Sequence, residues 1–100
     1  MPAPLTEPEL AGALARLAGW ERQPGRPAIS KTYQFDDFRA AFAWMVRIAE
    51  VAERMNHHPE WTNIYNRVEV TLATHDAGAV TQLDVDLALA MEGAWGDRDP

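Results

Sequence analysis

The stretch Arg67-Val68-Glu69-Val70-Thr71-Leu72 decides the fold class, because apolar side chains occupy every second position in it. A period of two predicts a β-strand that buries one face and exposes the other. The segment from Trp61 to Tyr65 is predicted to be its hairpin partner, although Asn63 and Asn66 leave the position of the turn open. Because the strands of a hairpin are antiparallel, the sheet is predicted to contain antiparallel pairs.

A second alternating stretch lies upstream, from Ile29 to Phe35. It follows Gln23-Pro24-Gly25-Arg26-Pro27, a segment dense in turn residues, so it is predicted to be the second strand of another hairpin. Between the two hairpins, a long helix is predicted from an N-cap at Asp36 or Asp37 to about Met55.

The long helix has an unusually broad apolar face. The residues predicted to form it are Phe38, Ala41, Phe42, Met45, Ile48, Ala49 and Ala52, widened by Trp44, Val51 and Met55. An arc this wide is more than one face of a sheet needs. The helix is therefore predicted either to lie deep in the core or to pack in part against another subunit.

The two outer helices are indicated by capping boxes, in which a threonine and an acidic residue three positions later satisfy each other's backbone amides. Thr6 with Glu9 starts a short first helix that is predicted to end near Gly19. Thr81 with Asp84 starts the last helix, and the stripe predicted to be buried on it is Leu83, Leu87, Met91 and Trp95. The tail from Gly96 is predicted to be polar and frayed.

The predicted order of elements is thus α-β-β-α-β-β-α. Two hairpins and three helices predict an α+β fold, a two-layer sandwich with the helices on one face of a four-stranded antiparallel sheet. A chain of 100 residues is long enough for one hydrophobic core. A single domain is therefore predicted over residues 1–100, with an ordered core at about 6–95.

The composition excludes several classes of function. The chain has no Cys, which excludes disulfides, thiolate metal sites and a cysteine nucleophile. A formal net charge of −6 disfavours direct binding of nucleic acid, because holding a phosphate backbone requires cationic side chains. The sequence shows neither a signal peptide nor an apolar run long enough to cross a bilayer, so we expect a cytoplasmic protein without a membrane partner.

All three histidines, His57, His58 and His75, are predicted to lie at the ends of helices or strands, where a two-layer fold can bring them to one rim. Three imidazoles could hold a metal ion, but the adjacent His57 and His58 point in different directions unless the backbone turns sharply. They could instead exchange protons, since imidazole titrates near neutral pH. They could also have structural roles only, and Asp84 could either cap its helix or orient a histidine.

A longer pattern joins these residues, and it resembles the signature of the pterin-4a-carbinolamine dehydratases. The matching residues, in order, are Glu53, His57-His58-Pro59, Glu60-Trp61, Tyr65-Asn66, Thr74-His75 and Asp84, preceded by the strand at 29–35 with Phe38 and Phe42. The resemblance covers roughly residues 6–95. It departs from the family at Asn56, where an aspartate is common.

This resemblance implies a lyase that removes water from a 4a-hydroxytetrahydropterin to give quinonoid dihydropterin, and so recycles the pterin cofactor of aromatic amino acid hydroxylases. It implies that neither a metal nor an organic cofactor is required. The residues implied to contact the pterin substrate are His57, His58, Pro59, Thr74, His75, Asp76 and Ala77. Trp61 is expected either to wall the pocket or to belong to the core.

The resemblance also implies roles for the side chains. His57 and His75 act as acid and base, in an order left open, and His58 positions the substrate. Asp84 orients a histidine ring, and Glu53 supports the site from behind. A homodimer or homotetramer is implied as well. An alternative of another class is a non-catalytic binding module, because relatives in this family are also known as dimerisation cofactors of a homeodomain transcription factor.

Overall fold

The alternating stretch Arg67–Leu72 (β4) lies inside a four-stranded antiparallel sheet. It pairs with β2 (Ile29–Gln34) on one side and β3 (Glu60–Ile64) on the other, and β1 (Glu21–Arg22) lies beyond β2, so the strand order is β1-β2-β4-β3. The structure is a computed structural model that describes residues 2–97. Its elements, in chain order, are α1 (Glu7–Arg16), β1 (Glu21–Arg22), β2 (Ile29–Gln34), α2 (Phe38–Met55), β3 (Glu60–Ile64), β4 (Arg67–Leu72), the 3-10 turn η1 (His75–Ala77) and α3 (Gln82–Gly96). The predicted α+β class and the order α-β-β-α-β-β-α are confirmed.

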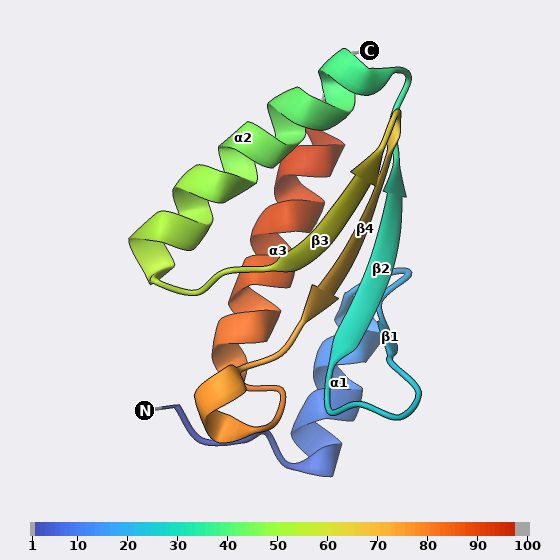
Figure 1. Ribbon diagram of the computed structural model, residues 1–100. Coiled ribbons are helices and arrows are strands. Elements are labelled where there is room, and N and C mark those ends of the chain that lie inside the picture. Colours follow the sequence, from blue (N-terminus) through green and yellow to red (C-terminus); the bar gives the residue numbers. More distant parts are fainter. Residues whose placement is uncertain (1, 98–100) are drawn as a thin grey trace.

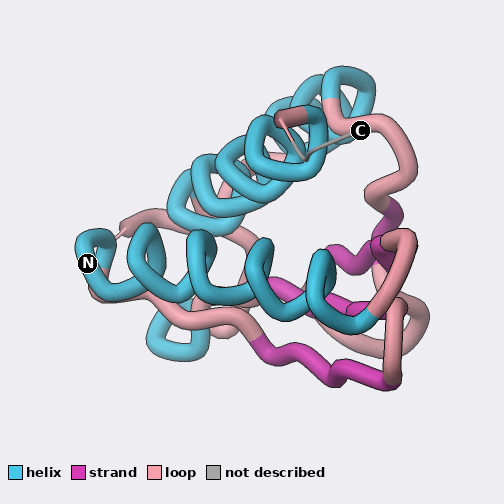
Figure 2. Tube along the Cα trace, turned by 90° about the horizontal axis from the view of Figure 1, so that it is seen from above, coloured by secondary structure: helices cyan, strands magenta, loops and turns pink. Residues whose placement is uncertain are grey.

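The sheet forms one layer, and α2 and α3 lie together on one side of it (Figure 1). Viewed from above, α2 crosses most of the width of the molecule (Figure 2). The ends of β2 pair with β4 at Ile29↔Leu72 and Gln34↔Arg67, so the two strands with a period of two are direct neighbours. In β4 the buried side chains are Val68, Val70 and Leu72, which alternate with more exposed ones as the sequence predicts. In β2 only Ile29 and Tyr33 are buried, with the half-buried Lys31 between them.

The turn between β3 and β4 consists of Tyr65 and Asn66, since Ile64 pairs with Arg67. Tyr65 has a φ of 51° and lies in the turn, not in the strand where the sequence placed it. The two asparagines that left the turn position open both serve this corner. The side-chain amide of Asn63 donates to the carbonyl of Tyr65, and that of Asn66 donates to the carbonyl of Phe35.

The buried face of α2 differs from the predicted one. The buried residues of this helix are Ala41, Trp44, Ile48 and Ala52. Phe38 and Phe42 are half exposed, at 48% and 51%, and Ala49 is exposed too. The predicted face was centred nearer to Phe38 and Phe42 than the observed one is. Apolar residues cover a wide arc of this helix, so the helical period alone does not show which part of the arc is buried. Trp44 belongs to the buried face, and its indole N–H donates to the carbonyl of Met91.

The helix ends are closely determined by local hydrogen bonds. Both capping boxes form, at Thr6 and at Thr81, and Asp37 caps α2. The α3 face is rotated relative to the prediction: Leu87 and Met91 are fully buried, whereas Leu83 and Trp95 are half-buried. The helix continues to Gly96, so the predicted polar tail lies largely outside the described residues.

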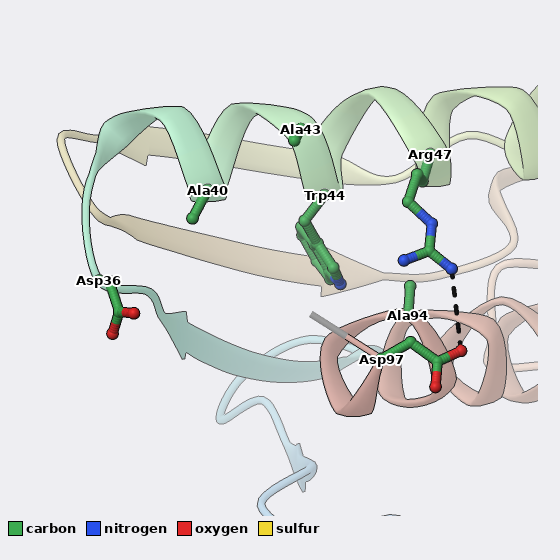
Figure 3. A pocket seen from close by; sticks show the side chains of 7 residues that line it. All are labelled: Asp36, Ala40, Ala43, Trp44, Arg47, Ala94 and Asp97. Carbon is green, nitrogen blue, oxygen red and sulfur yellow. Dashed lines mark ion pairs between the residues drawn. The ribbon is translucent and has the colours of Figure 1, made fainter. Parts of the chain in front are cut away.

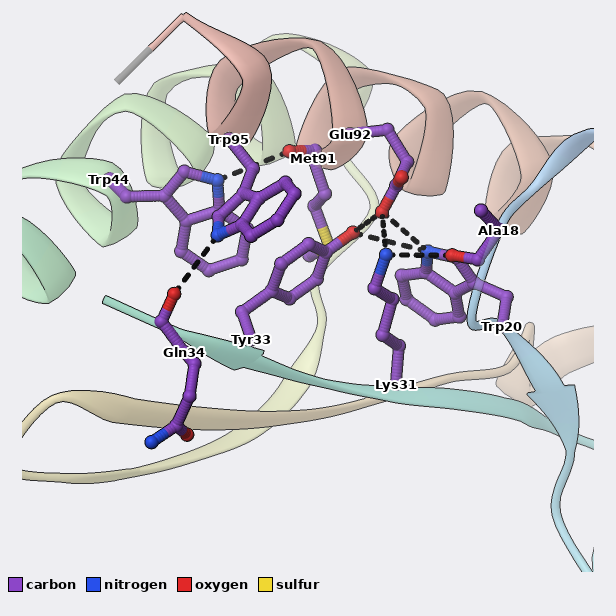
Figure 4. A network of polar contacts seen from close by, with 9 residues as sticks. All are labelled: Ala18, Trp20, Lys31, Tyr33, Gln34, Trp44, Met91, Glu92 and Trp95. Atoms are coloured by element: carbon purple, nitrogen blue, oxygen red, sulfur yellow. Dashed lines mark hydrogen bonds and ion pairs between the residues drawn. The ribbon is translucent and has the colours of Figure 1, made fainter. Parts of the chain in front are cut away.

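A cluster of polar side chains joins α3 to the sheet around Glu92 (Figure 4). One carboxylate oxygen of Glu92 accepts hydrogen bonds from Lys31 Nζ at 2.7 Å, from the Tyr33 hydroxyl and from the Trp20 indole at 3.3 Å. Lys31 Nζ also donates to the carbonyl of Ala18. The side chains of Lys31 and Glu92 are only 14% and 24% exposed, so this ion pair is largely shielded from water.

Candidate active site

A left-handed residue ends α2 directly before the two adjacent histidines. Asn56 has φ 52° and ψ 44°, a conformation that asparagine tolerates better than most residues. The backbone N–H of His57 then returns to the carbonyl of Ala52, which ends the helix. After this turn His57 is buried and His58 is exposed, so the two imidazoles have different environments.

His57 contacts a carboxylate that is completely buried. Its Nε2 lies 2.6 Å from Oδ1 of Asp84. The other oxygen of Asp84 accepts the backbone N–H of Thr81 at 2.9 Å and the hydroxyl of Thr74 at 2.8 Å. Asp84 therefore both caps α3 and holds an imidazole, so the two roles left open for it in the sequence are compatible.

His58 has a different partner on the surface. Its Nε2 lies 2.6 Å from a carboxylate oxygen of Glu53, one turn back on α2. Both side chains are exposed to water, at 56% and 76%. Because solvent screens exposed charges, this contact orients the His58 ring more than it stabilises the fold.

The end of α2 and the segment that follows β4 face each other across a cavity of about 480 Å³. The residues that line it are Pro2, Met55, Asn56, His57, His58, Ala73, Thr74, His75, Asp76 and Leu83. All three histidines thus reach one cavity. His75 begins η1, three residues beyond the end of β4, so the 3-10 turn rather than the strand itself brings it to the rim.

Several residues implied by the resemblance do not line this cavity. Pro59 and Ala77 are sequence neighbours of lining residues, and Glu53 and Asp84 contact histidines from behind. Trp61 is half-buried on β3, with its ring centre 6.1 Å from that of Trp44, so it packs against the core. Among residues 2–97, no group of three or more His, Cys, Asp or Glu side chains is placed to hold a metal ion.

An ion pair between Arg26 and Glu60 lies near His75. The pKa of the Glu60 carboxyl lies below its usual value, first because Arg26 donates hydrogen bonds to it and to a smaller extent because of His75. Arg26 binds both oxygens of Glu60, at 3.0 and 2.9 Å. A carboxylate that stays ionised therefore lies within electrostatic range of His75.

A smaller cavity of about 220 Å³ lies at the opposite end of the helical layer (Figure 3). Its lining carries Asp36, Arg47 and Asp97 but no imidazole, and Arg47 is 4.0 Å from Asp97. Because all three histidines line it, the histidine cavity is the candidate active site.

No helix in the described part of the chain is both long and apolar enough to span a bilayer.

Comparison with known proteins identifies the family of this chain. The family model described as pterin 4 alpha carbinolamine dehydratase matches residues 3–94. The chain belongs to this family. A relative from Bradyrhizobium sp. (strain ORS 278), provisionally named pterin-4-alpha-carbinolamine dehydratase, is 57% identical over 82% of this chain and 82% of its own length. A relative of the same name from Bordetella avium is 54% identical over 86% of this chain and 80% of its own length.

Solved structures share the fold of this dehydratase family. A crystal structure titled transcriptional coactivator/pterin dehydratase from Brucella melitensis is 48% identical, with a TM-score of 0.91, and covers 93% of this chain and 99% of the other. A pterin dehydratase-like protein identified as a RuBisCO assembly factor has a TM-score of 0.68 at 19% identity, covering 78% of this chain and 90% of the other. The second likeness shows the fold alone.

Sequence reasoning about this dehydratase-family site missed some of its members. Asn56 was noted only as a departure from the family pattern, although its left-handed backbone ends α2 directly before the two histidines. Thr81 was noted only as a helix cap, although its hydroxyl lies 2.6 Å from that of Thr74. The role of Asn56 could have been found, because an asparagine directly after a helical pattern is a signal for a left-handed helix end. The contact of Thr81 with Thr74 has no sequence signal, because it depends on the path of the intervening chain.

Proposed function

We propose that this chain dehydrates a 4a-hydroxytetrahydropterin to quinonoid dihydropterin, and so recycles the pterin cofactor of aromatic amino acid hydroxylases in the cytoplasm. The observation that carries the proposal is that His57 and His75 line the same cavity while Asp84 holds His57 from behind. Membership of the dehydratase family supports the reaction class.

The chemistry requires two proton transfers. The hydroxyl group on C4a leaves with a proton as water, and the proton on N5 is removed while its electron pair forms the C=N bond. Substrate thus becomes quinonoid dihydropterin and one water, with no net gain or loss of protons or electrons. Imidazoles suit both steps, because neutral and protonated rings coexist near neutral pH. Each positioned proton transfer is worth on the order of 10² to 10⁴ in rate.

In this proposal His57 and His75 form the acid and base pair. His58 positions the pterin, supported by Glu53, and Asp84 orients His57. The further substrate contacts carried over from the family are Pro59, Thr74, Asp76 and Ala77, of which Thr74 and Asp76 line the cavity. The reaction as proposed uses side chains only, without a metal or organic cofactor.

The decisive experiment is turnover of a 4a-hydroxytetrahydropterin by histidine variants. His57→Ala and His75→Ala should each lower kcat, and the double variant should lose nearly all activity above the uncatalysed rate. His58→Ala should chiefly raise KM. Circular dichroism and thermal melting serve as controls for folding. If the folded double variant dehydrates the pterin as fast as the wild type, the proposed mechanism is wrong and a binding-module function becomes the better explanation.

We also propose that the chain forms a homodimer or homotetramer through the exposed side of α2. Phe38 and Phe42 stack with ring centres 5.6 Å apart, and both are about half exposed, as is Val46. An apolar patch of this kind on a surface helix is typical of a protein interface. Light scattering at micromolar concentration should give a multiple of 11.2 kDa. Phe42→Asp should lower the mass, whereas Ala15→Asp, at an exposed position of α1, serves as a matched substitution away from α2.

A further inference from the structure

We propose that Thr74 and Thr81 are positioning residues: their hydroxyls form a one-way chain of hydrogen bonds to Asp84 that holds His57 with its proton on Nε2. Nδ1 is then the nitrogen through which His57 exchanges a proton with the substrate. The catalytic part of this inference rests on the proposed function. The protonation pattern itself can be measured without any turnover.

The direction of the chain follows from counting donors. A threonine hydroxyl has one hydrogen to donate. The hydroxyl of Thr74 donates it to Oδ2 of Asp84, at 2.8 Å. Its oxygen, 2.6 Å from that of Thr81, can therefore only accept in the second contact, and Thr81 must be the donor. Thr81 in turn accepts the backbone N–H of Leu83 at 3.2 Å, which completes its own bonding.

Asp84 is the end of this chain, and it meets donors on both oxygens. Oδ2 accepts the hydroxyl of Thr74 and the backbone N–H of Thr81. An ionised carboxylate only accepts hydrogen bonds, so Oδ1 requires a proton on the facing nitrogen of His57. A neutral imidazole carries one N–H, and placing it on Nε2 leaves the lone pair on Nδ1.

Burial makes these hydroxyls unsuitable as direct substrate contacts, so the pterin contact proposed above for Thr74 falls to its other atoms. Thr81 is completely buried and Thr74 is 5% exposed. Both hydrogens and the accepting lone pairs described above are engaged within the protein. Thr74 therefore reaches the cavity with little surface, and its hydroxyl acts through Asp84 and His57. This changes what a substitution at Thr74 should do: kcat should fall while KM stays near its wild-type value.

The same capping geometry occurs in α1, which provides a matched control. Thr6 caps α1 with a capping box like that of Thr81, but its hydroxyl lies on the surface and has no link to a histidine. Replacing either threonine by valine removes a helix cap. Only Thr81→Val also removes a donor from the chain to Asp84.

The first measurement is the tautomer of His57 in the wild-type protein, by NMR of ¹⁵N-labelled histidine at a pH where the ring is neutral. We expect the proton on Nε2. A proton on Nδ1 overturns the proposal, even if the chain proves to be an active dehydratase. If instead no pterin is turned over but the Nε2 tautomer is found, the proposed function fails and the hydrogen-bond chain stands.

The second measurement is kinetic. Thr74→Val should lower kcat about tenfold, because a hydrogen bond to the Asp84 carboxylate is lost. Thr81→Val removes only the donor to the neutral Thr74 hydroxyl, so it should lower kcat by a smaller factor, about threefold. In both variants KM should change less than about twofold. Thr74→Ser and Thr81→Ser keep the donor and should restore kcat. Thr6→Val should leave both constants unchanged. Folded valine variants with wild-type kcat overturn the positioning role. If the valine variants fail to fold, the wild-type tautomer and the activity of the serine variants still decide.

Discussion

Helix α3 carries two carboxylates in similar settings with different consequences. Asp84 and Glu92 each accept several hydrogen bonds from groups on other segments of the chain. The difference lies in the partner of each carboxylate. Glu92 faces the ammonium group of Lys31, whereas Asp84 faces the imidazole of His57, a type of side chain that commonly serves as acid or base in enzymes. The shielded ion pair of Lys31 and Glu92 serves the fold, whereas an imidazole that lines a cavity can take part in proton transfer.

The largest expected effect separates the two carboxylates by turnover. Asp84→Asn keeps a side chain that can cap α3 but removes the charge behind His57, so kcat should fall on the order of 10²-fold or more. Glu92→Gln should leave kcat within about twofold, because its cluster does not line the histidine cavity. Steady-state kinetics on 4a-hydroxytetrahydropterin measures both. Equal losses in the two variants would show that the comparison is wrong.

The next effect is on stability, where Glu92 should matter most. Glu92→Gln leaves the ammonium of Lys31 without its carboxylate in a place that is 14% exposed. The free energy of unfolding should fall by about 2 to 4 kcal/mol, since removing one partner of a shielded ion pair strands the other. Urea denaturation measures this change. The double variant Glu92→Gln/Lys31→Met removes the stranded charge and should recover part of the loss.

A smaller effect should appear at alkaline pH. Burial raises the pKa of Tyr33, and the hydrogen bond to the Glu92 carboxylate raises it further. The folded state therefore favours the neutral phenol, whereas the unfolded chain ionises near the ordinary pKa of about 10. The neutral phenol of Tyr33 therefore contributes to the free energy of unfolding in full below about pH 10, and this contribution is lost as the pH rises further.

Denaturation curves between pH 8 and 11 should show this decline in the wild type. Tyr33→Phe should be less steep over the same range, because it has no phenol to ionise at this position. Tyr65, which is 63% exposed, serves as the internal reference in a spectroscopic titration of tyrosine. A decline of equal steepness in the Phe variant would assign the alkaline instability to other groups.

The smallest expected effect is that of a chelator. If the imidazoles near Asp84 carry protons, exhaustive treatment with EDTA should leave kcat unchanged, and metal analysis should find no stoichiometric zinc, iron or copper. Loss of activity that a single metal restores would make the histidines ligands. The Asp84 site would then differ from the Glu92 cluster by binding a metal and not by transferring protons.

The local features of the chain could be predicted from sequence because their causes are local. The boxes at Thr6 and Thr81 form within one turn, and alternation in β2 and β4 follows from one buried sheet face. The exposed position of Phe42 could not be predicted. Apolar side chains cover a wide arc of α2, and only the packing of the helix in the folded protein determines which of them are buried.

The long-range contacts of the site could be predicted from the sequence only in part. The pairing of His57 with Asp84 spans 27 positions, and the spacing alone left Asp84 open between a cap and a partner. The family pattern favoured a histidine partner, but it said nothing of Thr81 behind it. The Glu92 cluster had no signal, since Trp20, Lys31 and Tyr33 meet it only after the two layers pack.

The position of β4 between β2 and β3 has a kinetic consequence. β3 and β4 are joined by a two-residue turn, so their pairing closes a short loop and costs little chain entropy. β2 can pair with β4 only after a loop containing all of α2 has closed. We expect the hairpin to form early and the central pair to limit the folding rate. Because His57 and Asp84 flank that hairpin, the hydrogen bond between them should appear only in the last phase of folding, when α3 docks.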